Sequence, residues 1–434
     1  MYELCSLSAT RLAQLVRQRD VSSLEVVDAH LQRIDEVNVT LNAVVQIAPD
    51  ARDRARAADA ALARGDAVGP LHGVPFTAKD WLETDDLICA AGFAERAQYT
   101  PKRDATVVAR MRAAGAILLC KTNVNDGSPV YPRPNNPYDV RRSPGGSSSG
   151  EAAIIAAGGS PLGLGSDSGG SIRLPAAWCG VAGLKPTNGF VPSTGHFPRI
   201  GSMSDLRTTI GPLSRRVEDL ALALRVIAGP DGRDPGVVPM PIGDPGRVDL
   251  SMLRVAFYTS MPAAAPSPAG GIAVAHAVGA LRDAGATVTD ATPPRLEESM
   301  PITIAYWSRV DSMSLTEWRP HRPSSLTADE IERSVFEWER FRSSKLQFAE
   351  DYDVIICPAA SDIAPHHRVL LKEDFAYTLP YSLTGYPVVV VRCGESEGMP
   401  VGLQVIARPW HDHVALVAAQ QIEDALGGWS APTE

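Results

Sequence analysis

Apolar residues recur along the chain at two periods, and the change of period separates predicted helices from predicted strands. The first 65 residues are helical in pattern: segments 8–20 and 22–37 each open with a serine suited to cap a helix and carry apolar residues at helical spacing. From residue 72 onward, short apolar runs alternate with amphipathic stretches. This alternation is typical of an α/β protein.

The alternation continues on both sides of a Pro/Gly-rich stretch, residues 229–250, which we interpret as a surface connection. We therefore expect a single α/β domain over residues 1–434, with a helical N-terminal segment 1–65 and a twisted mixed sheet covered by helices on both faces. The predicted strands are 43–47, 73–79, 116–122, 253–259, 353–358, 387–393 and 401–407, and the later predicted helices are 104–115, 216–228 and 270–284.

The amino-acid composition argues against nucleic-acid-binding and membrane-spanning proteins. Hydrophobic residues make up 44% of the 434 residues, which is typical of a globular protein. The net charge of −9 argues against nucleic acid as a partner and weakly against an anionic membrane surface. No apolar run approaches the roughly 18 residues of a membrane span, and the N-terminus has no apolar signal core.

Cysteine and lysine are both informative here. The six cysteines are scattered with no CxxC pair, so we expect neither a disulfide framework nor a zinc site, and a reducing cytoplasm. Only six lysines occur, against many arginines: Lys79, Lys102, Lys121, Lys185, Lys345 and Lys372. An arginine would serve wherever only a surface charge is needed, but it cannot act as a deprotonated amine.

The least ordinary stretch is 141–186, where serines and glycines are fused to the apolar segments EAAIIAAG and SIRLPAAWCGVAGL. A flexible linker would lack those apolar segments, so a polar site is the better interpretation. The GSSSG run at 146–150 fits G-x-S-x-G with Ser148 as nucleophile, but no buried strand precedes it. The region also lacks the lysine of a P-loop and the third glycine of a dinucleotide fingerprint, and no S-x-x-K occurs in the chain.

Four blocks together resemble the amidase signature family: GVPFTAKD (73–80), SPGGSSSGEAA (143–153), GSDSGGSIRLPAAWCGVAGLKPT (165–187) and a C-terminal block at 384–409. The resemblance runs from about residue 5 to 425 in the family's order, and the two key serines are 24 positions apart (171 − 147), the family's spacing.

The resemblance implies a role for each matching residue. Ser171 matches the nucleophile, Ser147 the bridging serine that follows a cis peptide bond, and Lys79 the general base. The N–H groups of Ser168, Gly169, Gly170 and Ser171 match the oxyanion hole. Asp167 and Arg173 flank this loop and are expected to brace it by a salt bridge. Chemically, a serine hydroxyl needs an adjacent base, and a buried lysine can supply one.

The substrate side is less typical of the family. Residues 122–139 match a loop that lines the substrate pocket, yet its middle, NDGSPVY, departs from the usual pattern. Candidate pocket residues are Asn125, Asp126 and Tyr131 in this loop, and Tyr306 and Trp307 in an aromatic segment expected to be helical through Trp318. The expected substrate is a neutral, small to medium amide.

Three hypotheses remain at this stage. The leading one is a stand-alone amidase with a small-molecule substrate and with no cofactor or metal. The resemblance also implies a homodimer, which is common in the family. A second is the glutaminase subunit of a tRNA-dependent amidotransferase, which belongs to the same family and works only with partner subunits. A third, of another class, is a non-catalytic binding protein that kept the fold, against which the intact Lys79, Ser147 and Ser171 argue.

Overall fold

A computed structural model describes residues 2–124, 128–198, 206–307, 312–313, 318–319 and 326–432. Within these ranges, eleven strands form one mixed sheet in the order β1-β3-β2-β4-β6-β5-β12-β13-β11-β7-β8. The strands are β1 (Val44–Ile47), β2 (Pro75–Lys79), β3 (Ile117–Thr122), β4 (Leu162–Asp167), β5 (Ala182–Lys185), β6 (Thr209–Ser214), β7 (Arg254–Phe257), β8 (Thr287–Asp290), β11 (Val354–Pro358), β12 (Val388–Ser396) and β13 (Met399–Ala407).

Parallel pairing is confined to two groups of strands. β2 lies between β3 and β4 in parallel, and β7 lies between β11 and β8 in parallel, whereas the other neighbours in the sheet are antiparallel. Every residue of β2, β3, β4, β6 and β11 is buried. Both faces of the sheet centre are therefore covered, and the chain forms a single large α/β domain.

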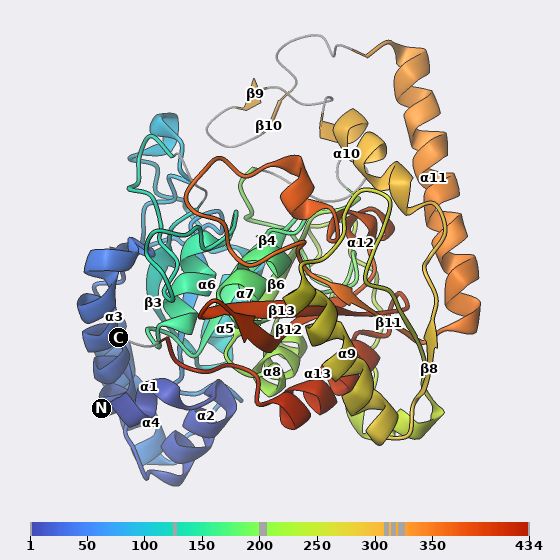
Figure 1. Ribbon diagram of the computed structural model, residues 1–434. Helices are drawn as coiled ribbons and strands as arrows, with labels where there is room; N and C mark the ends of the chain where they lie inside the picture. Colours follow the sequence, from blue (N-terminus) through green and yellow to red (C-terminus); the bar gives the residue numbers. More distant parts are fainter. Residues whose placement is uncertain are drawn as a thin grey trace.

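Thirteen α-helices surround the sheet in the described part of the chain (Figure 1). They are α1 (Tyr2–Ser6), α2 (Ala9–Gln18), α3 (Ser23–Leu41), α4 (Ala51–Arg64), α5 (Thr106–Ala113), α6 (Ser149–Ala156), α7 (Arg173–Trp178), α8 (Val217–Ile227), α9 (Pro268–Asp283), α10 (Ser299–Trp307), α11 (Ala328–Asp351), α12 (Leu379–Thr384) and α13 (Asp412–Leu426). None of the described helices is long and apolar enough to cross a membrane.

The predicted serine caps are present at both N-terminal helices. The Ser8 hydroxyl accepts the N–H of Arg11 at 3.0 Å, and the Ser22 hydroxyl accepts that of Glu25 at 3.1 Å. Glu25 in turn accepts the N–H of Ser22, which completes a capping box. These contacts satisfy N–H groups that the first helical turn leaves without intrahelical partners.

Two features differ from the sequence interpretation. β4 and β6 lie at the sheet centre, although their glycine, proline and hydroxyl residues give no strand signal. The sequence predicts a helix at Trp318, but its backbone lies in β10 (Trp318–Arg319), which pairs with β9 (Ser312–Met313) as a separate two-stranded ladder. The Pro/Gly-rich stretch 229–250 contains no α-helix or strand, and it joins α8 to the region of β7.

Candidate active site

Lys79 is the last residue of β2, and its side chain is completely buried. Its Nζ atom lies 2.7 Å from Oγ of Ser147 and 3.1 Å from Oγ of Ser166. The ring of Trp81 covers another side of the amine, with its centroid 4.0 Å from Nζ. The immediate polar neighbours of the amine are thus two hydroxyl groups.

Burial lowers the pKa of Lys79 well below its ordinary value, because a charged ammonium is costly away from water. The negative charges of Asp167 and Glu151 oppose this shift without cancelling it. The lysine can therefore present a neutral amine, which accepts a proton, in a range where an exposed lysine would be fully charged.

Ser147 lies at the entry to α6, after a Gly146–Ser147 peptide bond that is cis. The adjacent Ser148 forms hydrogen bonds to the second glycine–serine segment, residues 165–187. Its N–H donates to the carbonyl of Ser171 at 3.1 Å, and its hydroxyl donates to the carbonyl of Ser166 at 3.3 Å. The fold thereby brings Lys79, Ser147 and the Ser171 backbone into one place.

Ser171 is half-buried in the turn between β4 and α7. The carboxylate of Asp167 holds this turn, because it accepts the N–H groups of Gly170 at 2.8 Å and Ile172 at 3.2 Å. Gly170 has a φ of 137°, and a Cβ there would overlap the Thr378 hydroxyl. Only glycine fits both the backbone conformation and the space.

Arg173 holds the turn in place through an ion pair and hydrogen bonds to neighbouring segments. Its guanidinium forms a buried ion pair with Asp167, with Nη2 2.9 Å from Oδ1. The same guanidinium donates to the carbonyl of Thr378 at 2.7 Å, to Gln404 at 2.9 Å and to Ser382 at 2.6 Å. Burial alone would raise the pKa of Asp167, but the Arg173 charge and the donated hydrogen bonds hold it below its ordinary value. Asp167 is therefore an ionised brace.

The N–H groups of this turn divide into two kinds. Gly170 donates its N–H to Asp167. Those of Ser168, Gly169 and Ser171 donate no hydrogen bond within the described part of the chain. Three donors of the four predicted ones are thus available to a bound oxygen. No hydrogen bond between described residues links the Ser171 hydroxyl to Ser147.

Two aromatic residues of α10 lie beside the turn. Trp307 is 40% exposed, and its ring lies so close to Gly169 that a Cβ there would be 3.2 Å from Cζ2. Tyr306 packs edge-on against Trp338 with a centroid distance of 5.7 Å. The two predicted pocket residues of this helix therefore differ, since Trp307 contacts the turn and Tyr306 packs against α11.

Arg207 connects the aromatic residues to the turn. It is buried, and its guanidinium lies over the Tyr306 ring at 3.9 Å from the centroid. It also donates to the Ser168 hydroxyl at 2.9 Å. The Ser168 side chain is thus held from outside the turn.

The remaining pocket candidates belong to the 122–139 segment that follows β3. The Tyr131 hydroxyl donates to Oδ2 of Asp80 at 2.5 Å, so this tyrosine is tied to the residue that follows the lysine. Burial and the Asp80 carboxylate raise the pKa of Tyr131, which therefore stays a phenol. Asn125 and Asp126 lie outside the described residues.

Sequence reasoning misses three residues that touch the site. The resemblance assigns no role to Ser166, but its hydroxyl contacts Lys79. His196 and Arg207 carry no motif signal, since each follows the glycine–serine region in a loop without periodicity. The one usable signal is for Ser166, which stands inside the matched block one residue before Asp167.

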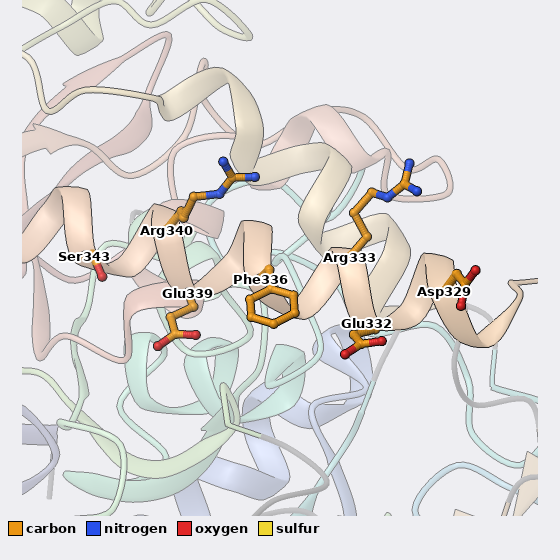
Figure 2. A pocket seen from close by; sticks show the side chains of 7 residues that line it. All are labelled: Asp329, Glu332, Arg333, Phe336, Glu339, Arg340 and Ser343. Atoms are coloured by element: carbon orange, nitrogen blue, oxygen red, sulfur yellow. The ribbon is translucent and has the colours of Figure 1, made fainter.

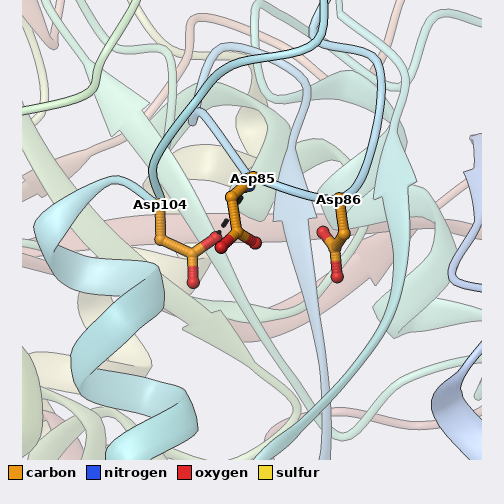
Figure 3. Close-up of side chains that lie close together, drawn as sticks. All are labelled: Asp85, Asp86 and Asp104. Carbon is orange, nitrogen blue, oxygen red and sulfur yellow. Dashed lines mark hydrogen bonds between the residues drawn. The ribbon is translucent and has the colours of Figure 1, made fainter.

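Two other groups of polar residues lie apart from the serines. Among described residues, Asp85, Asp86 and Asp104 are close enough to share a metal ion (Figure 3). Arg112 forms ion pairs with two of the three, at 2.8 Å from Asp86 and 3.4 Å from Asp104. A shallow groove follows one face of α11 and is lined by its own side chains, between Asp329 and Ser343 (Figure 2). Neither group contains a residue that contacts the serines.

Similarity to known proteins agrees with this geometry. The sequence profile of the amidase family matches residues 25–416. An acylamidase of Rhodococcus erythropolis is 33% identical, over 98% of this chain and 96% of that protein. One of the subunits of the glutamyl-tRNA(Gln) amidotransferase of Roseiflexus castenholzii is 34% identical, over 96% of this chain and 95% of that protein. The crystal structure of a peptide amidase from Stenotrophomonas maltophilia superposes with a TM-score of 0.82, at 26% identity, covering 99% of this chain and 98% of that one.

A profile match over most of the chain, with relatives above 30% identity over nearly their full length, shows the family. The chain belongs to the amidase family and is an enzyme that hydrolyses amide carbon–nitrogen bonds.

Proposed function

We propose that the protein is a stand-alone amidase that forms an acyl-enzyme on Ser171, with Ser147 as proton relay and Lys79 as general base. The observation that carries the proposal is the buried Lys79 amine, 2.7 Å from the Ser147 hydroxyl and with no carboxylate in hydrogen-bonding contact with it among described residues. An amine in that setting can accept a proton from a hydroxyl, which is what an activated serine requires.

Acylation proceeds by coupled proton transfers. Ser147 passes its proton to the neutral Lys79 amine and takes the proton of Ser171, while Oγ of Ser171 bonds to the amide carbon. The tetrahedral intermediate collapses when Ser147 donates a proton to the amide nitrogen, so that the carbon–nitrogen bond breaks and ammonia or an amine departs. Lys79 returns its proton to Ser147. Protonation of the leaving nitrogen matters because an amide anion is a very poor leaving group.

Deacylation uses the same groups with water as the nucleophile. Water loses a proton to the relay and attacks the ester carbon, after which the carboxylic acid departs and Ser171 regains its hydroxyl proton. In both halves the oxyanion would be held by the N–H groups of Ser168, Gly169 and Ser171, whereas Gly170 keeps the turn attached to Asp167. Each lost oxyanion donor typically costs roughly 10²–10³ in rate.

The acyl group of the substrate would lie against Trp307. This ring is partly exposed and contacts Gly169, so it forms an aromatic wall directly beside the proposed oxyanion site. Aromatic surface favours an apolar acyl group. We therefore propose a neutral carboxamide with an apolar acyl side as the substrate class.

The nucleophile is tested with Ser171→Ala and a serine-directed fluorophosphonate probe. We expect the unaltered protein to be labelled and to release ammonia or amine from a panel of aliphatic and aryl amides, and Ser171→Ala to do neither. Ser149→Ala is the matched control, because Ser149 is buried next to Ser148 and its hydroxyl has no hydrogen bond within the described residues. Unchanged turnover in Ser171→Ala would overturn the assignment, and a folded protein that never labels would favour a non-catalytic role.

The main alternative is the glutaminase subunit of a tRNA-dependent amidotransferase. It is favoured by the similarity to the Roseiflexus castenholzii protein, which at 34% identity is level with the similarity to the acylamidase at 33%. The two proposals differ in partner requirement. Turnover of simple amides by the purified chain supports the stand-alone enzyme, whereas glutamine hydrolysis that occurs only with a co-purified partner supports the amidotransferase role.

The compartment and the assembly state complete the proposal. All six cysteines are buried free thiols, which suits a reducing compartment such as the cytoplasm. A homodimer remains a prediction, and light scattering on the purified protein would decide it.

A further inference from the structure

His196 lies in the loop between β5 and β6, and it is buried beside the residues that surround Lys79. Its Nδ1 atom is 2.7 Å from the carbonyl of Pro198, and its Nε2 atom is 2.8 Å from the hydroxyl of Ser166. The ring also meets Trp81 edge-on, with centroids 5.6 Å apart. Both nitrogens of the imidazole are therefore engaged, one of them one hydroxyl away from the lysine.

The Pro198 carbonyl settles the tautomer. A carbonyl oxygen can only accept, so the hydrogen of the neutral imidazole is on Nδ1 and Nε2 is an acceptor. The Ser166 hydroxyl must then donate its hydrogen to Nε2 of His196. Its oxygen keeps its lone pairs for an N–H of Lys79, whose Nζ is 3.1 Å away.

This direction of donation matters because a neutral amine has two hydrogens and one lone pair. With one N–H directed at Ser166, the lone pair is free to face the Ser147 hydroxyl, 2.7 Å from Nζ. Without an acceptor at residue 196, the Ser166 hydroxyl could rotate and donate to the lysine lone pair instead. The Lys79 lone pair would then accept a hydrogen bond from Ser166, which takes no part in the proposed proton relay, and would not be available to Ser147.

We propose that His196 is a positioning residue of the amidase reaction: through Ser166 it keeps the lone pair of Lys79 directed at Ser147. This inference rests on the proposed function, since it assumes that Lys79 is the base. The other groups that face the amine do not supply this orientation. Trp81 offers only a ring face, and Asp167 and Glu151 act on Lys79 through charge.

The first test compares two replacements of His196 with opposite expectations. His196→Phe keeps the ring that packs against Trp81 but removes the acceptor, and we expect kcat to fall about tenfold, the usual contribution of one hydrogen bond, with KM unchanged. His196→Gln offers an amide oxygen that can accept from Ser166 and should recover most of the loss. Equal kcat in the unaltered protein and His196→Phe would overturn the inference, as would a uniform loss in both variants.

The second test is a double-mutant cycle with Ser166→Ala, which removes the competing hydroxyl. In that background His196→Phe should have no further effect on kcat, because there is no proton left to direct. Additive losses would show that His196 acts only on folding or packing. Thermal unfolding of each variant reports its folded state.

The two proposals fail separately. If Lys79→Ala keeps full activity, the base assignment falls and the role of His196 falls with it. If Lys79→Ala is inactive and His196→Phe is fully active, the proposed function stands and only the positioning role is lost.

Discussion

Two neighbouring strands of the sheet each end in a region built around a buried lysine, and the two regions differ in what surrounds the amine. Lys79 on β2 and Lys121 on β3 lie on parallel strands, and both are completely buried. The Lys79 amine meets the hydroxyls of Ser147 and Ser166. The Lys121 amine meets a carboxylate, 3.6 Å from Oδ1 of Asp80, and donates to the carbonyl of Leu82.

The difference shows that burial alone does not make a base. Burial disfavours the charged form of any amine, but an adjacent carboxylate favours it again. Lys79 has no carboxylate in contact within the described residues, and burial lowers its pKa well below the ordinary value. Lys121 has Asp80, whose own pKa is raised by burial against the opposing charge of Lys121. We infer that the Lys79 region is arranged for proton transfer and the Lys121 region for holding the loop after β2.

The largest expected effect is on turnover when the amine of the first region is removed. Lys79→Met should lower kcat by roughly 10²–10⁴, the usual contribution of a general base, without loss of fold. Lys79→Arg should fare no better, because a guanidinium does not lose its proton in proteins. Steady-state kinetics on an amide substrate measures this, with thermal unfolding as the check on folding. Retained turnover in Lys79→Arg would show that Lys79 is not the general base.

The same change in the second region should affect stability instead. Lys121→Met leaves Asp80 buried without its cation, which typically costs about 3–5 kcal/mol in the free energy of unfolding. Urea unfolding measures this loss, and kcat of the folded fraction should change only a few-fold by comparison with Lys79→Met. Adding Asp80→Asn should recover part of the stability, because the unpaired charge is then gone. A catalytic loss in Lys121→Met without destabilisation would contradict the division of roles.

A smaller effect is expected where the second region meets the predicted pocket loop. Tyr131→Phe removes a hydrogen bond to the buried Asp80 and should lower the free energy of unfolding by about 1–3 kcal/mol. The aromatic ring remains in Tyr131→Phe. If substrate contacts only the ring, KM should therefore stay unchanged. A change in KM with unaltered stability would move Tyr131 from the scaffold to the substrate pocket.

The convergence of Lys79 and the serine blocks was expected from the resemblance to the amidase signature family, which rests on short, contiguous motifs. Asp167 and Arg173 are six positions apart, and the ion pair they form is local to the turn that they flank. The strands of alternating apolar runs were also predictable, as β2, β3, β11, β12 and β13 illustrate. Local periodicity and local spacing carry this kind of information.

The parts that could not be predicted depend on partners distant in sequence. The sequence of β4 is LGLGSD, and its glycines reflect close neighbours rather than a turn. A Cβ at Gly165 would be 2.8 Å from the hydroxyl of Ser148, the N-cap of α6, and one at Gly163 would overlap Glu151 on α6. Arg207 reaches Ser168 from 39 positions away, and His196 reaches Ser166 from 30 positions away. No single-sequence pattern registers such contacts.

The smallest expected effect concerns Glu151, the buried carboxyl that acts on Lys79 through charge. The hydroxyls of Thr77 and Thr122 donate to it, and burial nevertheless raises its pKa from 4.5 to about 7. Between those two pH values the folded chain holds a proton that the unfolded chain has lost, so this group's contribution to the free energy of unfolding declines as pH rises through the window. Glu151→Gln keeps the shape and should flatten that decline in urea unfolding measured at pH 4.5 and 7.

The Glu151→Gln change should also move the acidic limb of the kcat profile to lower pH, because the ionised Glu151 favours the protonated form of Lys79. Glu151 acts on Lys79 only through charge. An unchanged acidic limb would therefore mean that the charge of Glu151 does not affect the proton affinity of the Lys79 amine, and that its hydroxyl neighbours set this affinity. Lys79 would then differ from Lys121, which has a carboxylate beside it.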